Sequence, residues 1–408
     1  MQASQTGQGQ LPSTLNSLTG LRFLSAFLVF LAHTVGFLLV LMVNPAQDQY
    51  SRFFFSGANA GVTFFFILSG FILTWVAQSN DTKPAFWRRR FFKIYPNHLV
   101  AFAATVALMV YAGYTLTASN TLPTLFLIQS WIPSYEVSHF AGGNTPTWTL
   151  ACEMLFYFLF PWLLVAARRV KAANVWKWVW AVVVAIVAVP VIAQLLLPRE
   201  PIMQWDPIPW WHYWFVTHLP VTRLLEFALG ILMAQVVLHR KWIRIKLAPA
   251  LLIAAASLAV AAYLPDEYDQ VAPMALPIAL VIAAAATNDI NGKRTFFASR
   301  TMIWLGEISY AFYIVHFLVV NYGPMGAAYQ SFWTKQWTAG TAVRDTVLTL
   351  AISVVLAWLL YRFVERPAMR HWSRSKARRA ATVTTQTTAP VALAAEDRLD
   401  EREPASSR

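Results

Sequence analysis

Charged residues and cysteine are scarce in this 408-residue chain, and both shortages restrict what it can be. Asp, Glu, Lys and Arg together make up 12% of the sequence, whereas hydrophobic residues make up 57%. A soluble domain of this size cannot bury so much apolar surface, so the composition predicts an integral membrane protein. The single cysteine, Cys152, excludes an internal disulfide and a cysteine-based metal cluster. We expect no metal cofactor.

The positive charge of the chain follows the pattern of membrane topology. The formal net charge is +13, but the basic residues cluster in short loops between apolar runs, so we expect no nucleic-acid partner. Residues 1–20 carry no charge, and the first apolar run is longer than a signal-peptide core. We therefore expect no cleaved targeting segment.

Ten apolar stretches are long enough to cross a bilayer as helices. They cover residues 21–43, 58–78, 94–113, 147–167, 176–197, 217–238, 248–264, 271–288, 302–322 and 346–364. An eleventh stretch, 121–132, is short and has Pro123 near its start, which predicts a re-entrant or interfacial piece. The predicted fold class is all-α: a polytopic membrane protein with about ten transmembrane helices and one short additional helix.

Basic residues assign the two sides of the membrane. With ten spans and the N-terminus inside, the cytoplasmic segments hold 23 basic residues and the external loops hold four. This asymmetry follows the positive-inside rule and predicts a cytoplasmic (inner) membrane protein with both termini in the cytoplasm. We divide the chain into a cytoplasmic N-terminal segment (1–20), a transmembrane domain (21–365) and a cytoplasmic basic tail (366–408). From Ser373 onward the tail lacks the apolar residues needed to fold, so we expect it to be disordered.

Arg22 and His33 share the first span, which is otherwise almost wholly apolar. Eleven residues separate them, close to three helical turns, so both side chains point the same way. Arg22 would lie at one mouth of the membrane and His33 about 16 Å deeper, near the middle of the bilayer. An ionisable group at that depth is a candidate for function, and histidine suits proton transfer. A histidine that only packs against a neighbouring helix is the alternative.

A dense group of cations follows the second span. Residues 86–96 read Phe-Trp-Arg-Arg-Arg-Phe-Phe-Lys-Ile-Tyr-Pro, and we interpret this stretch as a cytoplasmic loop. Its cations are Arg88, Arg89, Arg90 and Lys93, more than orientation requires. They suit membrane lipid headgroups or the phosphates of a cofactor, and the charge run by itself favours lipid.

Glu153 lies two turns inside the apolar fourth span. With the predicted topology it sits about 9 Å below the external surface, near the level of His33. A buried carboxylate needs a partner, and His33 is a suitable one. A structural hydrogen bond between helices would satisfy the carboxylate equally well.

Other polar side chains within the spans have a packing explanation beside a functional one. Arg223 and Glu226 are three residues apart, where an ion pair satisfies itself. One face of the ninth span carries three polar residues that fit either a cavity wall or a polar seam between helices. Loop 198–214 holds four tryptophans, which suit an interfacial belt or a platform for a ring-bearing acceptor. The further candidates for substrate contact are Tyr157, Arg223, Glu226, Ser309, Tyr313 and His316.

Several motifs, in this order, resemble the membrane acyltransferase-3 family, multi-span O-acyltransferases of glycans and some secondary metabolites. The similar segments are Leu18–Arg22 with His33, Phe64–Phe71, the Arg-rich stretch ending Ile94-Tyr95-Pro96, Trp148–Tyr157, Ser309–His316 and Glu365-Arg366-Pro367. They span nearly all of residues 16–370. The resemblance implies that His33 is the catalytic histidine, that Arg22 and the Arg-rich stretch serve acyl-CoA, and that Glu153 completes the site.

The chain departs from the family pattern at several places. The family's Arg-x-x-Arg ends here in Lys93, which keeps the charge but loses bidentate phosphate geometry. Met154 replaces a second glutamate, and we expect no hydrolase-like domain after the last span. The sequence of residues 86–98, with Asn97 and His98, resembles that of relatives that acylate macrolide sugars or lactones.

Together these features predict an enzyme that moves an acyl group from cytoplasmic acyl-CoA to a hydroxyl. Arg22 and residues 88–93 would hold the CoA phosphates, and the pantetheine arm would carry the thioester to His33. His33 would deprotonate the acceptor or take the acyl group itself, with Glu153 orienting it. We expect acetyl-CoA as donor and a cell-surface carbohydrate as acceptor.

Three alternatives remain at this point. They are a macrolide or secondary-metabolite acyltransferase, a polytopic transporter, and a non-catalytic polysaccharide-export or lipid-binding component. A transporter would not need a dense cationic site beside the histidine helix.

Reporter fusions test the predicted topology. Fusions after Lys171, Lys246, Arg300 and Arg379 should report cytoplasm, and fusions at Asp206 and Asp266 the outside, because the basic loops stay inside. An external reporter at Lys171 would mean that 121–132 crosses the membrane and that the ten-span topology is wrong.

Overall fold

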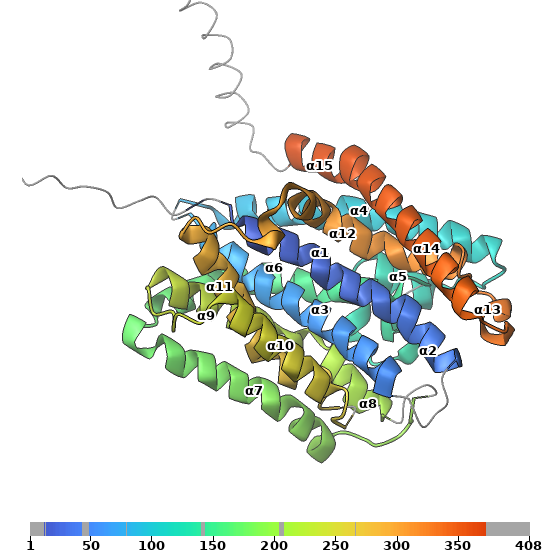
Figure 1. Ribbon diagram of the computed structural model, residues 1–408, viewed down its shortest axis with the longest axis horizontal. Helices are drawn as coiled ribbons and strands as arrows, with labels where there is room; N and C mark the ends of the chain where they lie inside the picture. The colour runs from blue at the N-terminus through green and yellow to red at the C-terminus, as the bar shows by residue number, and fades with distance from the viewer. Residues whose placement is uncertain are drawn as a thin grey trace, which may run out of the picture.

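The structure, a computed structural model, describes residues 12, 14–42, 49–78, 80–139, 143–203, 208–265 and 267–372. Most of these residues are helical, and among them there is one isolated β-bridge, between Ile202 and Pro209, and no strand, which confirms the all-α prediction. The long helices are α1 (Asn16–Leu31), α3 (Gln49–Trp75), α4 (Lys83–Tyr111), α6 (Trp148–Arg169), α7 (Val175–Leu196), α9 (Pro220–Leu238), α10 (Leu247–Ala261), α11 (Ala272–Ile290), α12 (Arg300–Tyr322) and α14 (Ala339–Leu360). They form one bundle with α7 on one flank and α14 on the other (Figure 1).

Short helical pieces extend or connect these long helices. A π-helical turn, η1 (Ala32–Gly36), and α2 (Phe37–Met42) continue α1, and η10 (Tyr361–Glu365) and α15 (Arg366–His371) continue α14. The connecting pieces are α5 (Ala118–Leu125), η3 (Gln129–Trp131), η4 (Tyr135–His139), η6 (Thr145–Thr147), η7 (Ala172–Asn174), α8 (Trp210–Tyr213), η8 (Trp214–His218), η9 (Phe296–Ala298) and α13 (Gln330–Thr334).

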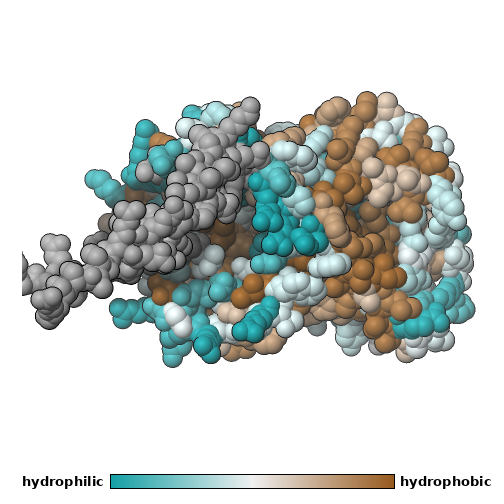
Figure 2. All heavy atoms as spheres, turned by 90° about the horizontal axis from the view of Figure 1, so that it is seen from above, coloured by the Kyte–Doolittle hydropathy of each residue, from teal (hydrophilic) through white to brown (hydrophobic). Residues whose placement is uncertain are grey.

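Nine helical segments of the described chain are long and apolar enough to cross a membrane, and α10 is a shorter apolar helix of 15 residues. We call the end of the bundle where α1 begins the near end, and the opposite one the far end. The Trp176 indole donates to the Lys241 carbonyl at the near end, and the Arg52 guanidinium donates to the Leu264 carbonyl at the far end. Helix α10 connects these two positions, so it also runs from end to end. On the face in Figure 2, hydrophobic residues cover a broad middle region and hydrophilic residues lie toward its ends.

The predicted short segment around 121–132 does not span the bundle. Helix α5 has eight residues, and the His98 imidazole and Tyr95 hydroxyl lie 3.0 and 3.1 Å from the Thr124 and Leu125 carbonyls. His98 is 13 residues from the far end of α4, so α5 descends about 20 Å beside it. The chain then returns and starts α6 well inside the bundle. Such irregular backbone is tolerated at membrane depth where protein surrounds it.

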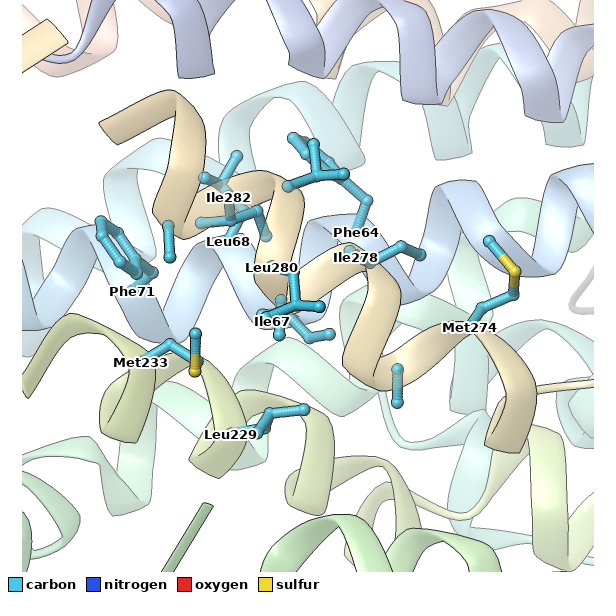
Figure 3. Close-up of a cluster of buried hydrophobic side chains, with 14 of the residues drawn as sticks. Phe64, Ile67, Leu68, Phe71, Leu229, Met233, Met274, Ile278, Leu280 and Ile282 are labelled. Atoms are coloured by element: carbon cyan, nitrogen blue, oxygen red, sulfur yellow. The ribbon is translucent and has the colours of Figure 1, made fainter. Parts of the chain in front are cut away.

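Close helix contact builds the core between α3, α9 and α11 (Figure 3). A Cβ added at Gly230 would lie 1.9 Å from the Ile67 carbonyl oxygen, and one added at Gly70 would lie 2.1 Å from the Phe227 carbonyl oxygen. The two glycines therefore let α3 and α9 touch backbone to backbone, as small residues do in membrane bundles. Ile67, Phe71 and Leu229 pack beside this contact.

One sequence-based assignment is wrong. The Arg-rich stretch is not a loop: it forms the first turns of α4, which begins at Lys83 with Pro84 in its first turn, a position that favours helix initiation. Helix α1 begins at Asn16, before the apolar stretch that starts at residue 21, because the Ser17 amide and hydroxyl donate to the Asp289 carboxylate and satisfy the start of the helix. The predicted disordered tail from Ser373 lies outside the described residues.

The glycine contact predicts the cost of a single methyl group. Gly230→Ala should destabilise the protein by about 1–3 kcal/mol, because the backbone of α3 cannot move away without disturbing the core. Thermal unfolding in detergent measures the effect. Gly340→Ala on α14 is the matched control: its new Cβ meets only the Thr338 hydroxyl, at 4.0 Å, and the midpoint should stay equal or rise. Equal midpoints for the two variants would contradict this packing argument.

Candidate active site

His33 lies in a widened turn of the first membrane helix. The α-helix ends at Leu31, and Ala32–Gly36 form a single π-helical turn before α2 continues the span. The Thr34 hydroxyl donates to the Phe30 carbonyl at 2.9 Å and holds the turn from its inner side. Single π-turns within α-helices occur frequently at functional sites. The backbone conformation thus indicates a functional role for His33 independently of the sequence argument.

The hydrogen-bond partner of His33 is His316 of α12. His33 Nδ1 lies 3.0 Å from His316 Nε2, and the two rings are nearly parallel, with centroids 5.3 Å apart. Phe317 packs edge-on against His33 at 4.8 Å. His316 is fully buried, and its Nδ1 lies 2.8 Å from the Tyr313 carbonyl oxygen. His316, a predicted substrate contact, therefore lies on the buried side of His33 and contacts it directly.

A pocket of about 570 Å³, counting its open mouth, lies between α1, α3, α4, α6 and α12. Its charged side chains come from three different helices, and three tyrosines and a cluster of apolar residues complete the wall. The lining residues are Arg22, Val62, Phe65, Phe66, Lys93, Ile94, Thr149, Leu150, Glu153, Tyr157, Tyr310 and Tyr313. Five predicted site residues thus surround one space: Arg22, Lys93, Glu153, Tyr157 and Tyr313. The pocket ends at Tyr313, one helical turn before His316.

Glu153 belongs to the cationic part of this pocket. It accepts a hydrogen bond from Tyr157 and interacts electrostatically with Arg22, Arg90 and Lys93. The Ser69 hydroxyl donates to the Tyr157 hydroxyl at 3.3 Å and extends this chain to α3.

The predicted position of Glu153 beside His33 is wrong. Helix α6 begins inside the bundle, where the Asn144 amide donates to the Ile314 carbonyl in the middle of α12. Two turns of helix therefore carry Glu153 past the level of His33 toward Arg22. Its role in the chemistry stays a prediction.

The cations of α4 divide between the pocket and other partners. The Arg90 guanidinium lies 5.8 and 5.9 Å from the ring centroids of Phe86 and Tyr157. Lys93 forms an ion pair with Glu365, although it also lines the pocket. Arg89 pairs with Asp81. Arg88 and Arg89 share α4 with these residues but do not line the pocket.

Comparison with known proteins identifies the family. The sequence model described as "Acyltransferase domain" matches residues 15–362. The chain belongs to the acyltransferase-3 family of membrane O-acyltransferases. Acyltransferase MdmB of Streptomyces mycarofaciens is 35% identical over 369 residues, which cover 89% of this chain and 93% of that protein. The resemblance inferred from the motifs is thereby confirmed, and with it the assignment as an enzyme.

Two further relatives differ in how much of their length the acyltransferase covers. The exopolysaccharide production protein ExoZ of Rhizobium meliloti is 25% identical, over 83% of this chain and 96% of the relative. The putative peptidoglycan O-acetyltransferase YrhL of Bacillus subtilis is 23% identical, over 79% of this chain but 52% of the relative. The match therefore covers only about half of that longer protein. No solved structure matches the chain.

The remaining predicted contacts of the acyltransferase lie outside the main pocket. Arg223 Nε is 2.9 Å from Glu226 Oε2 in a buried ion pair, and the Arg223 guanidinium packs over the Phe66 and Trp148 rings. The Ser309 hydroxyl donates to the carbonyl of Gly306, within its own helix. The packing alternative accounts for these contacts. Arg223 and Glu226 also line a second, smaller pocket, and substrate contact by these residues stays a prediction.

The aromatic loop is anchored to the re-entrant segment. The Trp210 and Trp214 indoles donate to the carbonyls of Pro133 and Ser130. Trp205 lies outside the described residues. The two indole N–H groups therefore hold the loop in place instead of facing a ligand.

The partner of Lys93 in this acyltransferase was not predicted from the sequence. The Glu365 carboxylate is buried and also accepts a hydrogen bond of 2.7 Å from the Asn97 amide. The available signal was a carboxylate at the end of an apolar span, which requires a cation or a donor nearby. Tyr310, whose hydroxyl donates to the Ile94 carbonyl beside the pocket, was also missed.

Proposed function

We propose that this protein takes an acyl group from cytoplasmic acyl-CoA and transfers it to a hydroxyl of a carbohydrate at the cytoplasmic membrane, with acetyl as the expected group. One observation carries the proposal: a pocket with cations at one end leads to within one turn of a histidine pair at mid-span. The near end of the bundle would face the cytoplasm, as the basic residues indicate.

The cations of the pocket suit the donor. Arg22 and Lys93 line it, and Arg90 lies against its Tyr157 wall. Charge-assisted hydrogen bonds from such groups bind phosphate strongly. Arg22 and His33 are separated by about 16 Å along the helix, a distance comparable to the length of a pantetheine arm. A nucleotide held at the near end would therefore present its thioester to His33.

His33 would supply the base. As the acceptor oxygen attacks the thioester carbonyl carbon, its proton passes to His33 Nε2; the carbon–sulfur bond then breaks and the thiolate recovers that proton. The reaction is balanced without any further reactant. Transfer through an acyl-His33 intermediate is the other route, and single-turnover trapping of labelled enzyme without acceptor distinguishes the two.

A carbohydrate acceptor is favoured by the names of the relatives. They include proteins of peptidoglycan O-acetylation and exopolysaccharide production. A macrolide or another secondary metabolite is the second candidate, suggested by residues 86–98. Asn97 and His98 weaken that suggestion, because both side chains are buried and bonded to Glu365 and to the α5 carbonyls. Purified protein, radiolabelled acetyl-CoA and a panel of glycan and macrolide acceptors would separate the two classes.

His33→Ala should abolish transfer while leaving folding intact. A general base contributes about 10²–10⁴-fold to the rate, so turnover should fall by that factor or more. His239→Ala, at the exposed near end of α9, is the control and should keep full activity. Gel filtration and acyl-CoA binding would show that both variants are folded. Turnover of His33→Ala within a few-fold of wild type would overturn the assignment.

Neutralising Arg90 and Lys93 together should weaken acyl-CoA binding tenfold or more. The reason is that each charged contact to phosphate contributes about 1.5–3 kcal/mol. Calorimetry with CoA and dephospho-CoA measures the effect and its dependence on the 3′-phosphate. Dephospho-CoA should bind the wild type more weakly than CoA does. The double variant should bind dephospho-CoA and CoA with similar affinity.

Two controls accompany this experiment. Glu365→Gln removes the partner of Lys93 but keeps the cation, and Arg169→Gln removes an exposed cation at the near end of α6. Both should bind acyl-CoA like the wild type. Equal affinity in the double variant would instead make the α4 cluster a lipid anchor.

A further inference from the structure

The proposed reaction requires a particular form of His33. A neutral imidazole carries one N–H and one lone pair, and the hydrogen bond made by one nitrogen decides which nitrogen keeps the proton. If Nε2 is to accept the proton of the acceptor, Nδ1 must carry the hydrogen. A neighbouring group must therefore fix the hydrogen on Nδ1.

The chain of contacts begins at the backbone of α12. His316 Nδ1 lies 2.8 Å from the Tyr313 carbonyl oxygen and 3.2 Å from the Phe312 carbonyl oxygen. Carbonyl oxygens only accept hydrogen bonds, so Nδ1 of His316 must be the protonated nitrogen. In the neutral ring, Nε2 of His316 then holds the lone pair.

The hydrogen of His33 is fixed in the same way. Its Nδ1 is 3.0 Å from Nε2 of His316, which can only accept, so Nδ1 of His33 carries the hydrogen and donates it. Nε2 of His33 is left with the lone pair. Among the described residues, no hydrogen bond to that nitrogen occurs, and His33 is partly exposed whereas His316 is fully buried.

The surroundings keep both rings in this arrangement. Phe30 and Phe312 pack against His316 with ring centroids 6.4 and 5.8 Å away. Helices α1 and α12 approach closely, since a Cβ on Gly306 would lie 1.9 Å from the Thr19 carbonyl oxygen. Apolar packing also disfavours two protonated rings side by side. The pair therefore accepts one extra proton at a time, at the open nitrogen of His33.

We propose that His316 is a positioning residue that sets the tautomer of His33 and stabilises it once it has taken the proton of the acceptor. His316 would do for His33 what the aspartate does for the histidine of a serine-protease triad, with the Tyr313 carbonyl holding His316 in turn. This inference rests on the proposed function, because it assigns a role within that reaction.

Two amide substitutions separate the contacts of His316. His316→Gln places an amide oxygen near the position of Nε2, so it still accepts from His33 but gives up the backbone bond. His316→Asn places an amide nitrogen near the position of Nδ1, so it keeps the Tyr313 bond but does not reach His33. His316→Leu removes both contacts.

Steady-state kinetics should rank these variants by their contact with His33. Loss of the correct tautomer costs about 10⁴-fold in kcat in a protease triad. We expect His316→Asn and His316→Leu to lose 10²–10⁴-fold in kcat with an unchanged KM for acyl-CoA, and His316→Gln to stay within about tenfold of wild type. A merely structural role would make Asn at least as active as Gln, and a substrate contact would raise KM for the acceptor instead; either result would overturn the proposal.

A spectroscopic measurement tests the tautomer without relying on turnover. In the wild type labelled with ¹⁵N-histidine, the His33 signal, assigned by its loss in His33→Asn, should show a protonated Nδ1 and an unprotonated Nε2. The opposite pattern refutes the proposal even if the variants misfold. If the wild type shows the expected tautomer but no acyl transfer with any donor and acceptor, the proposed function fails while the positioning of His33 by His316 stands.

Discussion

The structure depends on one constraint: a polar side chain placed deep in an apolar bundle needs a partner within that bundle. The described spans meet it with pairs from different helices, His33 with His316 and Lys93 with Glu365, and with Arg223 and Glu226 within α9. An unpartnered group at such depth would cost several kcal/mol. These pairs therefore fix which helices are neighbours as firmly as the apolar packing does, and Lys93 of one pair also lines the pocket.

Close backbone contact makes these pairs geometrically possible. Gly306 lets α12 touch α1, and Gly230 lets α9 touch α3, with hypothetical Cβ atoms less than 2.0 Å from the facing carbonyls. Helices α1 and α12 run in the same direction, so contact near Thr19 places His33 opposite His316 several turns later. The short His–His distance is thus a consequence of a glycine placed far from the chemistry.

The membrane-spanning helices were predicted more accurately from the sequence than the depth of their residues in the bundle. Apolar runs located the spans, and a proline and a short length identified the segment that does not cross. The same reasoning selected Arg22, Lys93 and Glu153, which the fold gathers around one pocket. It placed Glu153 beside His33, because it assumed that every span starts at the membrane surface. Helix α6 starts inside the bundle, and only the tertiary contacts of residues 144–149 reveal this.

Electrostatics favours a separation between the cations of the pocket and the proposed base. Phosphate binding requires cations, whereas the proposed base must become positively charged during the reaction, and nearby cations oppose that step. At an effective dielectric constant of 20, two unit charges interact by about 4 kcal/mol at 4 Å but by about 1 kcal/mol at 16 Å. Arg22 lies at roughly the larger distance from His33 along α1. Glu153 interacts electrostatically with Arg22, Arg90 and Lys93. In the proposed reaction, Glu153 would therefore act on the cations, and His33 would be left with His316, a neutral partner that accepts its hydrogen bond without adding positive charge.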